Sequence, residues 1–286
     1  MDYHDHGLAL DLEKMLAQPA SRRQSLRWLF AGAAAVPLAS CGGSGADSGF
    51  GISTSTTTGS TGTSGTGSTS AACAVIPEET GGPYPGDGSN RNANGVANAL
   101  ILSGIVRSDI RTSVAGASGT APGVPLTIRL QLVNVVSDCA PATGAAVYLW
   151  HCTREGGYSM YSSGITNENY LRGVQEADSQ GLVTFTTIFP GCYDGRMPHV
   201  HFEVYPTLAK ANSASNRIKT SQFTFPMASL NEAYTASGYG TSASNLARIS
   251  YATDNVFSDG TALQMASVTG NASQGYVATI TVGVSL

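Results

Sequence analysis

The stretch Leu126-Thr-Ile-Arg-Leu-Gln-Leu132 decides the fold class, because its apolar and polar residues alternate without interruption. Successive side chains of a β-strand point to opposite faces, so this pattern predicts a strand with one buried and one solvated face. Strand-like segments recur at 145–150, 182–188, 199–205, 221–225 and 276–284. Short strands at close intervals, separated by turn sequences, predict an all-β fold, an antiparallel sandwich or barrel. Of these we expect the antiparallel β-sandwich, with few or no helices.

The composition of the 286 residues agrees with this fold class. Charged residues make up 12% of the chain and Gly occupies 34 positions, which excludes a coiled coil or long-helix protein. Only 227–234 has a short helical pattern. A net charge of -4 gives no electrostatic reason to expect nucleic acid as a partner. No apolar run approaches the roughly 20 residues that span a bilayer, so we expect no integral membrane segment in the mature protein.

The first forty residues have the features of an export signal, in which a basic run (21–27) precedes an apolar stretch (28–38). The adjacent Arg22 and Arg23 resemble a twin-arginine (Tat) signal, with ordinary Sec export as the alternative. Leu38-Ala-Ser-Cys41-Gly42 resembles a bacterial lipobox, which predicts a lipid anchor at Cys41; the alternative is an ordinary signal peptide with a chance cysteine. We therefore expect an exported protein on the periplasmic side, lipid-anchored to a bacterial membrane.

The chain divides into three parts by composition. Residues 1–40 form the predicted signal peptide, 41–72 a linker, and 73–286 the globular domain. Ser53–Ser70 contains only Gly, Ser and Thr, so it cannot bury a core and is expected to act as a flexible tether.

Four cysteines lie outside the signal region, which is an even number in a chain expected to be exported. We expect disulfides among them. Three pairings are possible, and the residue spacing does not choose among them. The chain has no Cys-x-x-Cys pair, which argues against a four-thiolate metal site. These cysteines are Cys73, Cys139, Cys152 and Cys192.

Two histidines two residues apart are the main chemical feature of the chain. On a strand, His199 and His201 point to the same face, while the intervening Val200 belongs to the opposite, apolar face. Two imidazoles on one strand face suit a metal ion, although two hydrogen-bonded structural histidines are the simpler alternative. No nearby acidic residue supplies a facial triad, so the neighbouring candidate ligands are tyrosines. A phenolate is a hard oxygen donor that suits ferric iron, and a bound cation lowers the pKa of a phenol.

Several motifs around these histidines resemble the intradiol ring-cleavage dioxygenases, the catechol and protocatechuate 3,4-dioxygenase group. Thr187-Ile-Phe-Pro-Gly191 leads into Tyr193 and Arg196, as the family's Thr-Ile-x-Pro-Gly-x-Tyr element does. Upstream, a segment ending in Trp150 and a Gly-containing turn precede Tyr158. Further matches are Pro77-Glu-Glu-Thr-Gly-Gly-Pro-Tyr84, Leu171-Arg-Gly-Val-Gln175 and Ser221-Gln222-Phe223, so the resemblance covers residues 75–284.

The resemblance implies a non-haem Fe(III) enzyme that cleaves a catechol-type ring between its hydroxyls with O2, giving a cis,cis-muconate-type product. It implies four metal ligands: Tyr158, Tyr193, His199 and His201. Tyr193 resembles the ligand that leaves the metal when a catechol chelates it. Arg196 would stabilise negative charge on the substrate ring, and Gln222 would be a polar residue behind the ligands. The partners implied are a small aromatic diol and O2.

One departure from the soluble catechol enzymes concerns the pocket wall. Only two residues separate Tyr193 from Arg196, where those enzymes carry a longer loop. This predicts a more open site and resembles the exported, lipoprotein-type branch of the family. The N-terminal helical dimerisation region has no counterpart, so we expect a monomer or weak homo-oligomer. The competing hypotheses are a non-catalytic β-sandwich binding module with a vestigial metal site, and a protein that holds iron without turnover.

Overall fold

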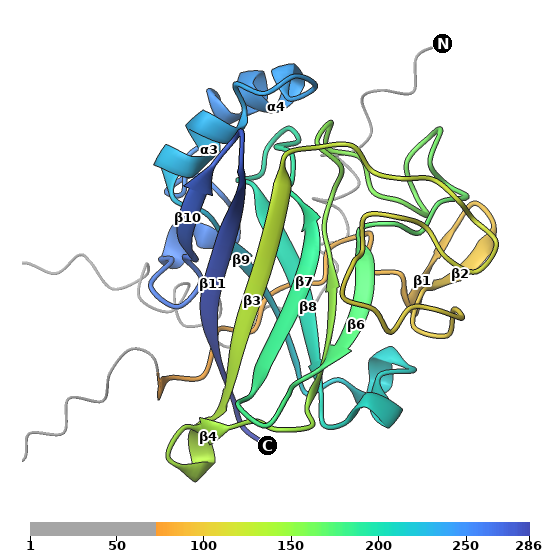
Figure 1. Ribbon diagram of the computed structural model, residues 1–286, viewed down its shortest axis with the longest axis vertical. Helices are drawn as coiled ribbons and strands as arrows, with labels where there is room; N and C mark the ends of the chain where they lie inside the picture. Colours follow the sequence, from red (N-terminus) through yellow and green to blue (C-terminus); the bar gives the residue numbers. More distant parts are fainter. Residues whose placement is uncertain (1–72) are drawn as a thin grey trace, which may run out of the picture. The chain divides into compact units, whose positions relative to one another are not determined.

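The computed structural model describes residues 73–286, shown in Figure 1. The predicted signal peptide, the anchor at Cys41 and the linker at 41–72 lie outside the described residues. Within the described part, no helix has the length and apolar character needed to cross a bilayer.

The first large sheet has five strands. In spatial order, β10, β11, β3 and β4 lie side by side, and β7 pairs with the other part of β3. Their bounds are β3 Pro125–Asn134, β4 Ala140–Pro141, β7 Leu182–Ile188, β10 Ser267–Asn271 and β11 Gly275–Val284. Every pairing is antiparallel except that of β11 with β3, which is parallel from Tyr276 opposite Leu126 to Val284 opposite Asn134.

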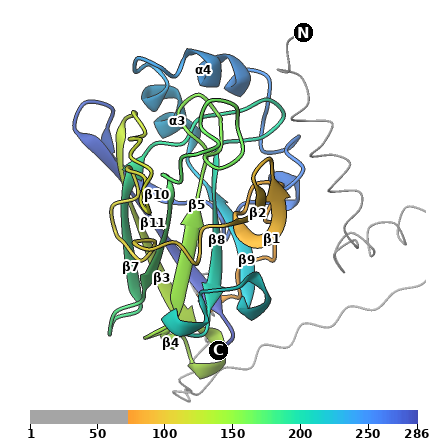
Figure 2. The same ribbon diagram turned by 90° about the vertical axis from the view of Figure 1, so that its right-hand side faces the viewer.

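The second sheet is antiparallel throughout and has the order β6, β5, β8, β9. Its strands are β5 Ala146–Trp150, β6 Arg172–Glu176, β8 His199–Tyr205 and β9 Lys219–Thr224. Figure 2 shows the two sheets as facing layers, and a separate hairpin of β1 (Asp87–Asn92) and β2 (Gly95–Asn98) beside the second sheet. The prediction of a β-sandwich with few helices is confirmed.

The main hydrophobic core lies between the two sheets. Leu130 and Phe185 of the first sheet belong to the same buried cluster as Leu149, Phe202 and Phe223 of the second. A smaller cluster covers the outer face of the second sheet, where Leu100 and Ile105 pack with Tyr148 and Trp150. Both faces of the second sheet are therefore covered, and chain segments outside the sandwich enclose the face that carries His199 and His201.

The predicted segments compare closely with the observed ones. The strand limits 182–188 and 199–205 are identical to those of β7 and β8, and the helical pattern at 227–234 corresponds to α3 (Met227–Ala233). Helix α4 (Gly240–Leu246), which lies with α3 at one end of the sandwich (Figure 1), was not predicted. The short 3-10 turns are Val135–Ser137, Leu208–Lys210, Ala214–Asn216 and Phe257–Asp259.

The cysteine pairing that spacing left open is settled by the structure. Cys73 and Cys139 form a disulfide, which joins the start of the domain to the turn after β3. Cys152 and Cys192 are free thiols, and both are buried. Burial raises the pKa of each of these thiols to about 12, so both remain protonated and unreactive at neutral pH.

Candidate metal centre

The two histidines of β8 turn their rings to the outer face of the second sheet. Val200 and Phe202 point to the core between the sheets, so the alternation of the strand places His199 and His201 on the opposite face. Their Nε2 atoms approach to 3.0 Å. The exposed fractions of the two residues are only 1% and 2%, which means that the facing nitrogens lie in a nearly dry site.

Two tyrosines from different loops reach the same point. Tyr158 comes from the loop between β5 and β6, and its hydroxyl lies 3.4 Å from His199 Nε2. Tyr193 comes from the loop between β7 and β8, and its hydroxyl lies 3.2 Å from the same nitrogen. The structure thus brings together all four residues that the sequence singled out as metal ligands.

Hydrogen bonds and stacking fix the orientation of the imidazoles. His199 Nδ1 lies 2.7 Å from the carbonyl oxygen of Met197, which only accepts, so Nδ1 carries the proton and Nε2 presents a lone pair. The His201 ring stacks on Trp150, with centroids 4.8 Å apart and planes at 3°. His201 Nδ1 is buried without a hydrogen bond of ordinary geometry, and the stack on Trp150 helps to hold this ring.

Burial keeps the site uncharged in the metal-free protein. It lowers the pKa of His199 and of His201 well below the usual value, and the charge of Arg196 acts in the same direction on both. It raises the pKa of Tyr158 well above the usual value, Tyr193 raises it further, and Arg196 partly opposes this. The imidazoles are therefore neutral and able to coordinate, whereas the phenol of Tyr158 needs a nearby cation to ionise.

This donor set fits a hard, highly charged metal ion. In residues 73–286 no group of three or more His, Cys, Asp and Glu side chains could hold a metal, so any metal here relies on tyrosine oxygens. Two neutral imidazoles with two phenols that ionise on binding supply two negative charges, which suits a trivalent ion such as Fe(III) better than a divalent one. The Nε2 contact of His199 and His201 has the arrangement expected of two ligands that share one ion.

Arg196 lies beside these donors and is buried, with 5% of its surface exposed. Its Nε donates to Asp254 Oδ2 at 2.9 Å, and its Nη2 donates to Gln222 Oε1 at 2.7 Å. Burial acts to lower the pKa of Arg196, but attraction to Tyr193 and Asp254 outweighs it and the net shift is upward. A fixed positive charge is therefore held next to the tyrosines, and Gln222 is in direct contact with Arg196.

A second buried arginine supports the Tyr158 loop. Arg172 donates to the carbonyl oxygens of Tyr84, Pro85 and Ser159 at 2.9, 2.7 and 3.0 Å. These bonds tie the segment that contains Tyr84 to the residue after Tyr158, and the Tyr84 ring lies 5.0 Å from the Tyr158 ring between centroids. Tyr84 is partly buried and packs on a candidate ligand.

Helix α4 holds the Tyr193 loop from the other side. Ser242 Oγ accepts from the backbone N–H of Cys192 at 2.9 Å, and Asn245 Nδ2 donates to the Cys192 carbonyl at 2.7 Å. Both backbone groups of the residue before Tyr193 are thereby fixed. Sequence reasoning missed Ser242 and Asp254 as supports, because they lie 50 and 58 residues from their partners. Arg172 lies within the family-like segment 171–175, but the sequence assigned it no role.

The remaining described histidine has a structural environment. His151 Nδ1 lies 2.8 Å from the Cys152 carbonyl oxygen and Nε2 lies 2.7 Å from Thr187 Oγ1. Both ring nitrogens are therefore occupied by hydrogen bonds, as expected for a structural histidine rather than a metal ligand.

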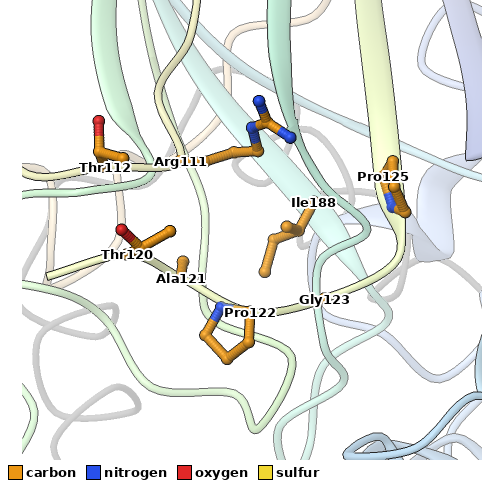
Figure 3. A pocket seen from close by; sticks show the side chains of 8 residues that line it. All are labelled: Arg111, Thr112, Thr120, Ala121, Pro122, Gly123, Pro125 and Ile188. Carbon is orange, nitrogen blue, oxygen red and sulfur yellow. The ribbon is translucent and has the colours of Figure 1, made fainter.

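A pocket of about 330 Å³ lies apart from this centre, with Thr112 and Thr120 on one side and Pro125 on the other (Figure 3). Its charged lining residue is Arg111, whose guanidinium donates to Asp109 at 3.0 and 2.7 Å. That charge is already paired, and the pocket lacks a second charged group. We therefore place the candidate site at the four convergent ligands.

Comparisons with known proteins agree with the geometry. Residues 106–214 match a family model described as Dioxygenase (Dioxygenase_C). Chlorocatechol 1,2-dioxygenase of Rhodococcus opacus is 32% identical over 68 residues, which are 23% of this chain and 26% of that protein. Chlorocatechol 1,2-dioxygenase of a Pseudomonas species is 34% identical over 98 residues, covering 28% of this chain and 38% of that protein. The chain thus matches well under half the length of these relatives.

The fold is similar to that of a solved structure over most of the described domain. The intradiol ring-cleavage dioxygenase from Tetranychus urticae superposes with a TM-score of 0.58 and 24% identity, covering 74% of this chain and 95% of that one. At this identity the likeness supports the fold alone. Residues 106–214 therefore match the Dioxygenase family model, and the described domain has a fold similar to that of an intradiol ring-cleavage dioxygenase.

Proposed function

We propose that this protein is a non-haem Fe(III) dioxygenase that cleaves the ring of a catechol-type diol between its hydroxyls with O2. The proposed ligands are Tyr158, Tyr193, His199 and His201. The observation that carries the proposal is the convergence of three ligand atoms within 3.4 Å of His199 Nε2, in a buried site next to a charged arginine.

The ferric ion, when bound, would supply the positive charge that keeps the phenols ionised and would orient the diol for reaction with O2. Tyr193 is partly exposed whereas Tyr158 is buried, so Tyr193 is the oxygen better placed to exchange with solvent or substrate. Tyr193 would hold the ion through its oxygen, and as the more accessible of the two phenolates it is the group proposed to take one proton from the diol. Tyr158, enclosed by Tyr84 and Tyr193, remains in place.

The proposed role of Arg196 follows from its fixed charge. Its guanidinium is electrostatically coupled to both Tyr158 and Tyr193, so it lies close enough to act on charge that builds up on a ring bound beside them. Because its partners Asp254 and Gln222 are already in position, little reorganisation is needed as that charge develops. Gln222 is proposed to keep the guanidinium in this orientation.

The proposal extends to the cell location. An export signal and a lipid anchor at Cys41, followed by the Gly/Ser/Thr-rich linker, would place the domain on the periplasmic side of a bacterial membrane. The Cys73–Cys139 disulfide is compatible with an oxidising compartment.

The visible absorption spectrum of the iron-loaded full chain, before and after addition of catechol, tests the function. Tyrosinate bound to Fe(III) gives a charge-transfer colour, and we expect catechol to shift this colour and O2 to bleach it as the ring is cleaved. Tyr158→Phe or His199→Ala should lose the iron or strongly alter the colour while the fold survives.

Tyr234→Phe is the matched control, because Tyr234 is a buried tyrosine whose hydroxyl donates to the Pro190 carbonyl at 3.0 Å. It should keep the full colour. Unchanged colour and turnover in Tyr158→Phe and His199→Ala would contradict the ligand assignment. A wild-type protein that stays colourless after ferric loading would favour the non-catalytic binding module, and a coloured one that never turns over a catechol would favour iron binding alone.

A further inference from the structure

Asp254 is a buried carboxylate far along the chain from the ligand loop that it contacts. Its exposed fraction is 0%, and it accepts four hydrogen bonds. A buried carboxylate is costly unless its oxygens are satisfied, so this arrangement indicates a defined role.

The two oxygens of Asp254 serve different segments. Oδ1 accepts from the backbone N–H groups of Val256 and Phe257 at 2.8 and 3.0 Å, which closes a local turn. Oδ2 accepts from Arg196 Nε at 2.9 Å and from the backbone N–H of Met197 at 2.7 Å. One oxygen therefore supports the turn and the other supports the loop that leads into the HxH strand.

The contact with Arg196 fixes one edge of the guanidinium, and Gln222 fixes another. Gln222 Oε1 accepts from Arg196 Nη2 at 2.7 Å, and Gln222 Nε2 donates to the Thr80 carbonyl at 2.8 Å. A planar group bonded at two separate nitrogens cannot rotate about its long axis. The direction of the arginine charge is therefore set by Asp254 and Gln222 together.

Asp254 also acts on the backbone beside a proposed ligand. It binds the N–H of Met197, and the carbonyl oxygen of the same residue accepts from His199 Nδ1 at 2.7 Å. The backbone of Met197 therefore links the Asp254 carboxylate to the His199 imidazole. The other three candidate ligand atoms all lie close to Nε2 of this imidazole.

We propose that Asp254 is a positioning residue for the reaction: its Oδ2 holds Arg196 at the site and steadies the backbone of Met197 behind His199. This inference rests on the proposed function for its catalytic consequence. The alternative is that Asp254 serves only as the cap of its own turn through Oδ1, in which case loss of Oδ2 would not affect Arg196.

Asp254→Asn separates these two roles. An asparagine keeps one oxygen that can accept from Val256 and Phe257, but it places an NH₂ donor where Oδ2 faced two N–H donors. The matched control is Asp194→Asn in the Tyr193 loop, because that carboxylate is 65% exposed and pairs with Arg248 at the surface.

The first measurement uses the metal-free protein and does not depend on turnover. In a ¹H–¹⁵N NMR spectrum, the Nε–H of Arg196 should exchange slowly with solvent, because it is buried and bonded to Asp254; Arg196→Lys assigns the signal by removing it. We expect the slow signal in wild type and Asp194→Asn and its loss in Asp254→Asn. A fast-exchanging Arg196 Nε–H in wild type would overturn the proposal even if Asp254→Asn failed to fold.

The second measurement is a double-mutant cycle on the iron-loaded protein. Arg196→Ala should lower kcat about 10²–10³-fold, and Asp254→Asn should lower it about 100-fold with a smaller change in KM. If Asp254 acts through Arg196, Asp254→Asn should lower kcat less than about 3-fold further in the Arg196→Ala background. Equal effects in both backgrounds would show that Asp254 does not act through Arg196 and would overturn that role. If wild type never turns over a catechol, the proposed function fails, while the NMR experiment still decides whether Asp254 positions Arg196.

Discussion

Strand β8 is buried along its whole length, yet its two faces are stabilised by different means. Val200, Phe202 and Val204 pack into the hydrocarbon core between the sheets. His199, His201, Glu203 and Tyr205 are equally buried on the other face, where every side chain carries an ionisable group. The degree of burial alone therefore does not distinguish the hydrophobic core from the candidate metal centre in this protein.

The ionisable face depends on partners for each polar group. Glu203 Oε2 accepts from Tyr205 at 2.6 Å, and Oε1 lies 3.7 Å from Arg217 Nε. Burial, reinforced by Asp87, raises the pKa of Glu203 to about 8, so this carboxyl is mostly protonated at neutral pH. At the other end of the face, His199 and His201 direct their Nε2 atoms at each other. A metal ion would satisfy those nitrogens, whereas Glu203 is already satisfied by its neighbours.

The largest effect on stability is expected on the apolar face. Phe202 is fully buried in the main core, so Phe202→Ala should lower the free energy of unfolding by about 3–5 kcal/mol through lost burial and the cavity that remains. His201→Ala removes a smaller and more polar ring, so it should cost less, but it should abolish the ferric colour. Urea denaturation followed by tryptophan fluorescence measures the first quantity, and the visible spectrum measures the second.

Ile101→Ala is the control for loss of an apolar side chain outside the core. Because Ile101 is 69% exposed, this substitution should change the free energy of unfolding by less than about 0.5 kcal/mol. A larger loss of stability for His201→Ala than for Phe202→Ala would show that the two faces are not divided as proposed.

The division between the faces of β8 was predictable from sequence, because side-chain alternation depends only on neighbours along the strand. The same reasoning located β3 and β7, and the family motifs singled out Tyr158 and Tyr193. The partner of Arg196 was not predictable, because Asp254 lies 58 residues away and no periodic pattern links the two positions. The parallel pairing of β3 with β11 and the pairing of Cys73 with Cys139 likewise depend on how distant segments pack.

The stability of the metal-free protein should depend on pH through His151, which is a structural histidine, unlike the candidate ligands His199 and His201. Burial lowers the pKa of His151 to about 4, from an ordinary value of 6.5. Between these values the unfolded chain binds a proton that the folded protein does not, so stability is complete above about pH 6.5 and falls as the pH drops toward 4. The loss from this one group reaches roughly 3 kcal/mol at pH 4.

Denaturation of the metal-free protein at several pH values measures this dependence. His151→Gln, which keeps a donor and an acceptor near Thr187, should be less stable at pH 7 but should reduce the slope below pH 6.5 by about 1.4 kcal/mol per pH unit. His199 and His201 contribute their own slope, which the variant leaves in place. An unchanged slope in His151→Gln would mean that His151 binds a proton as readily in the folded protein as in the unfolded chain. It would contradict the description of His151 as a buried, neutral histidine.

The smallest effect concerns the space beside His201. Gly82 has a φ of +66°, and a Cβ there would lie 3.3 Å from His201 Cε1. Gly116 has a φ of +91° with nothing within 4 Å of the added carbon, so Gly116→Ala is the matched control for backbone strain. Each change to Ala should cost about 1–2 kcal/mol of stability, because an L-residue is disfavoured at positive φ.

Only Gly82→Ala should also disturb the site, since the added methyl group presses on an imidazole that Trp150 holds from its face. We expect a shifted ferric absorption band and a weaker hold on iron in a chelator competition, with neither change in Gly116→Ala. If both variants lost stability equally and both kept the wild-type spectrum, His201 would have room to move, and the close packing of the ionisable face would not be what fixes the ligand geometry.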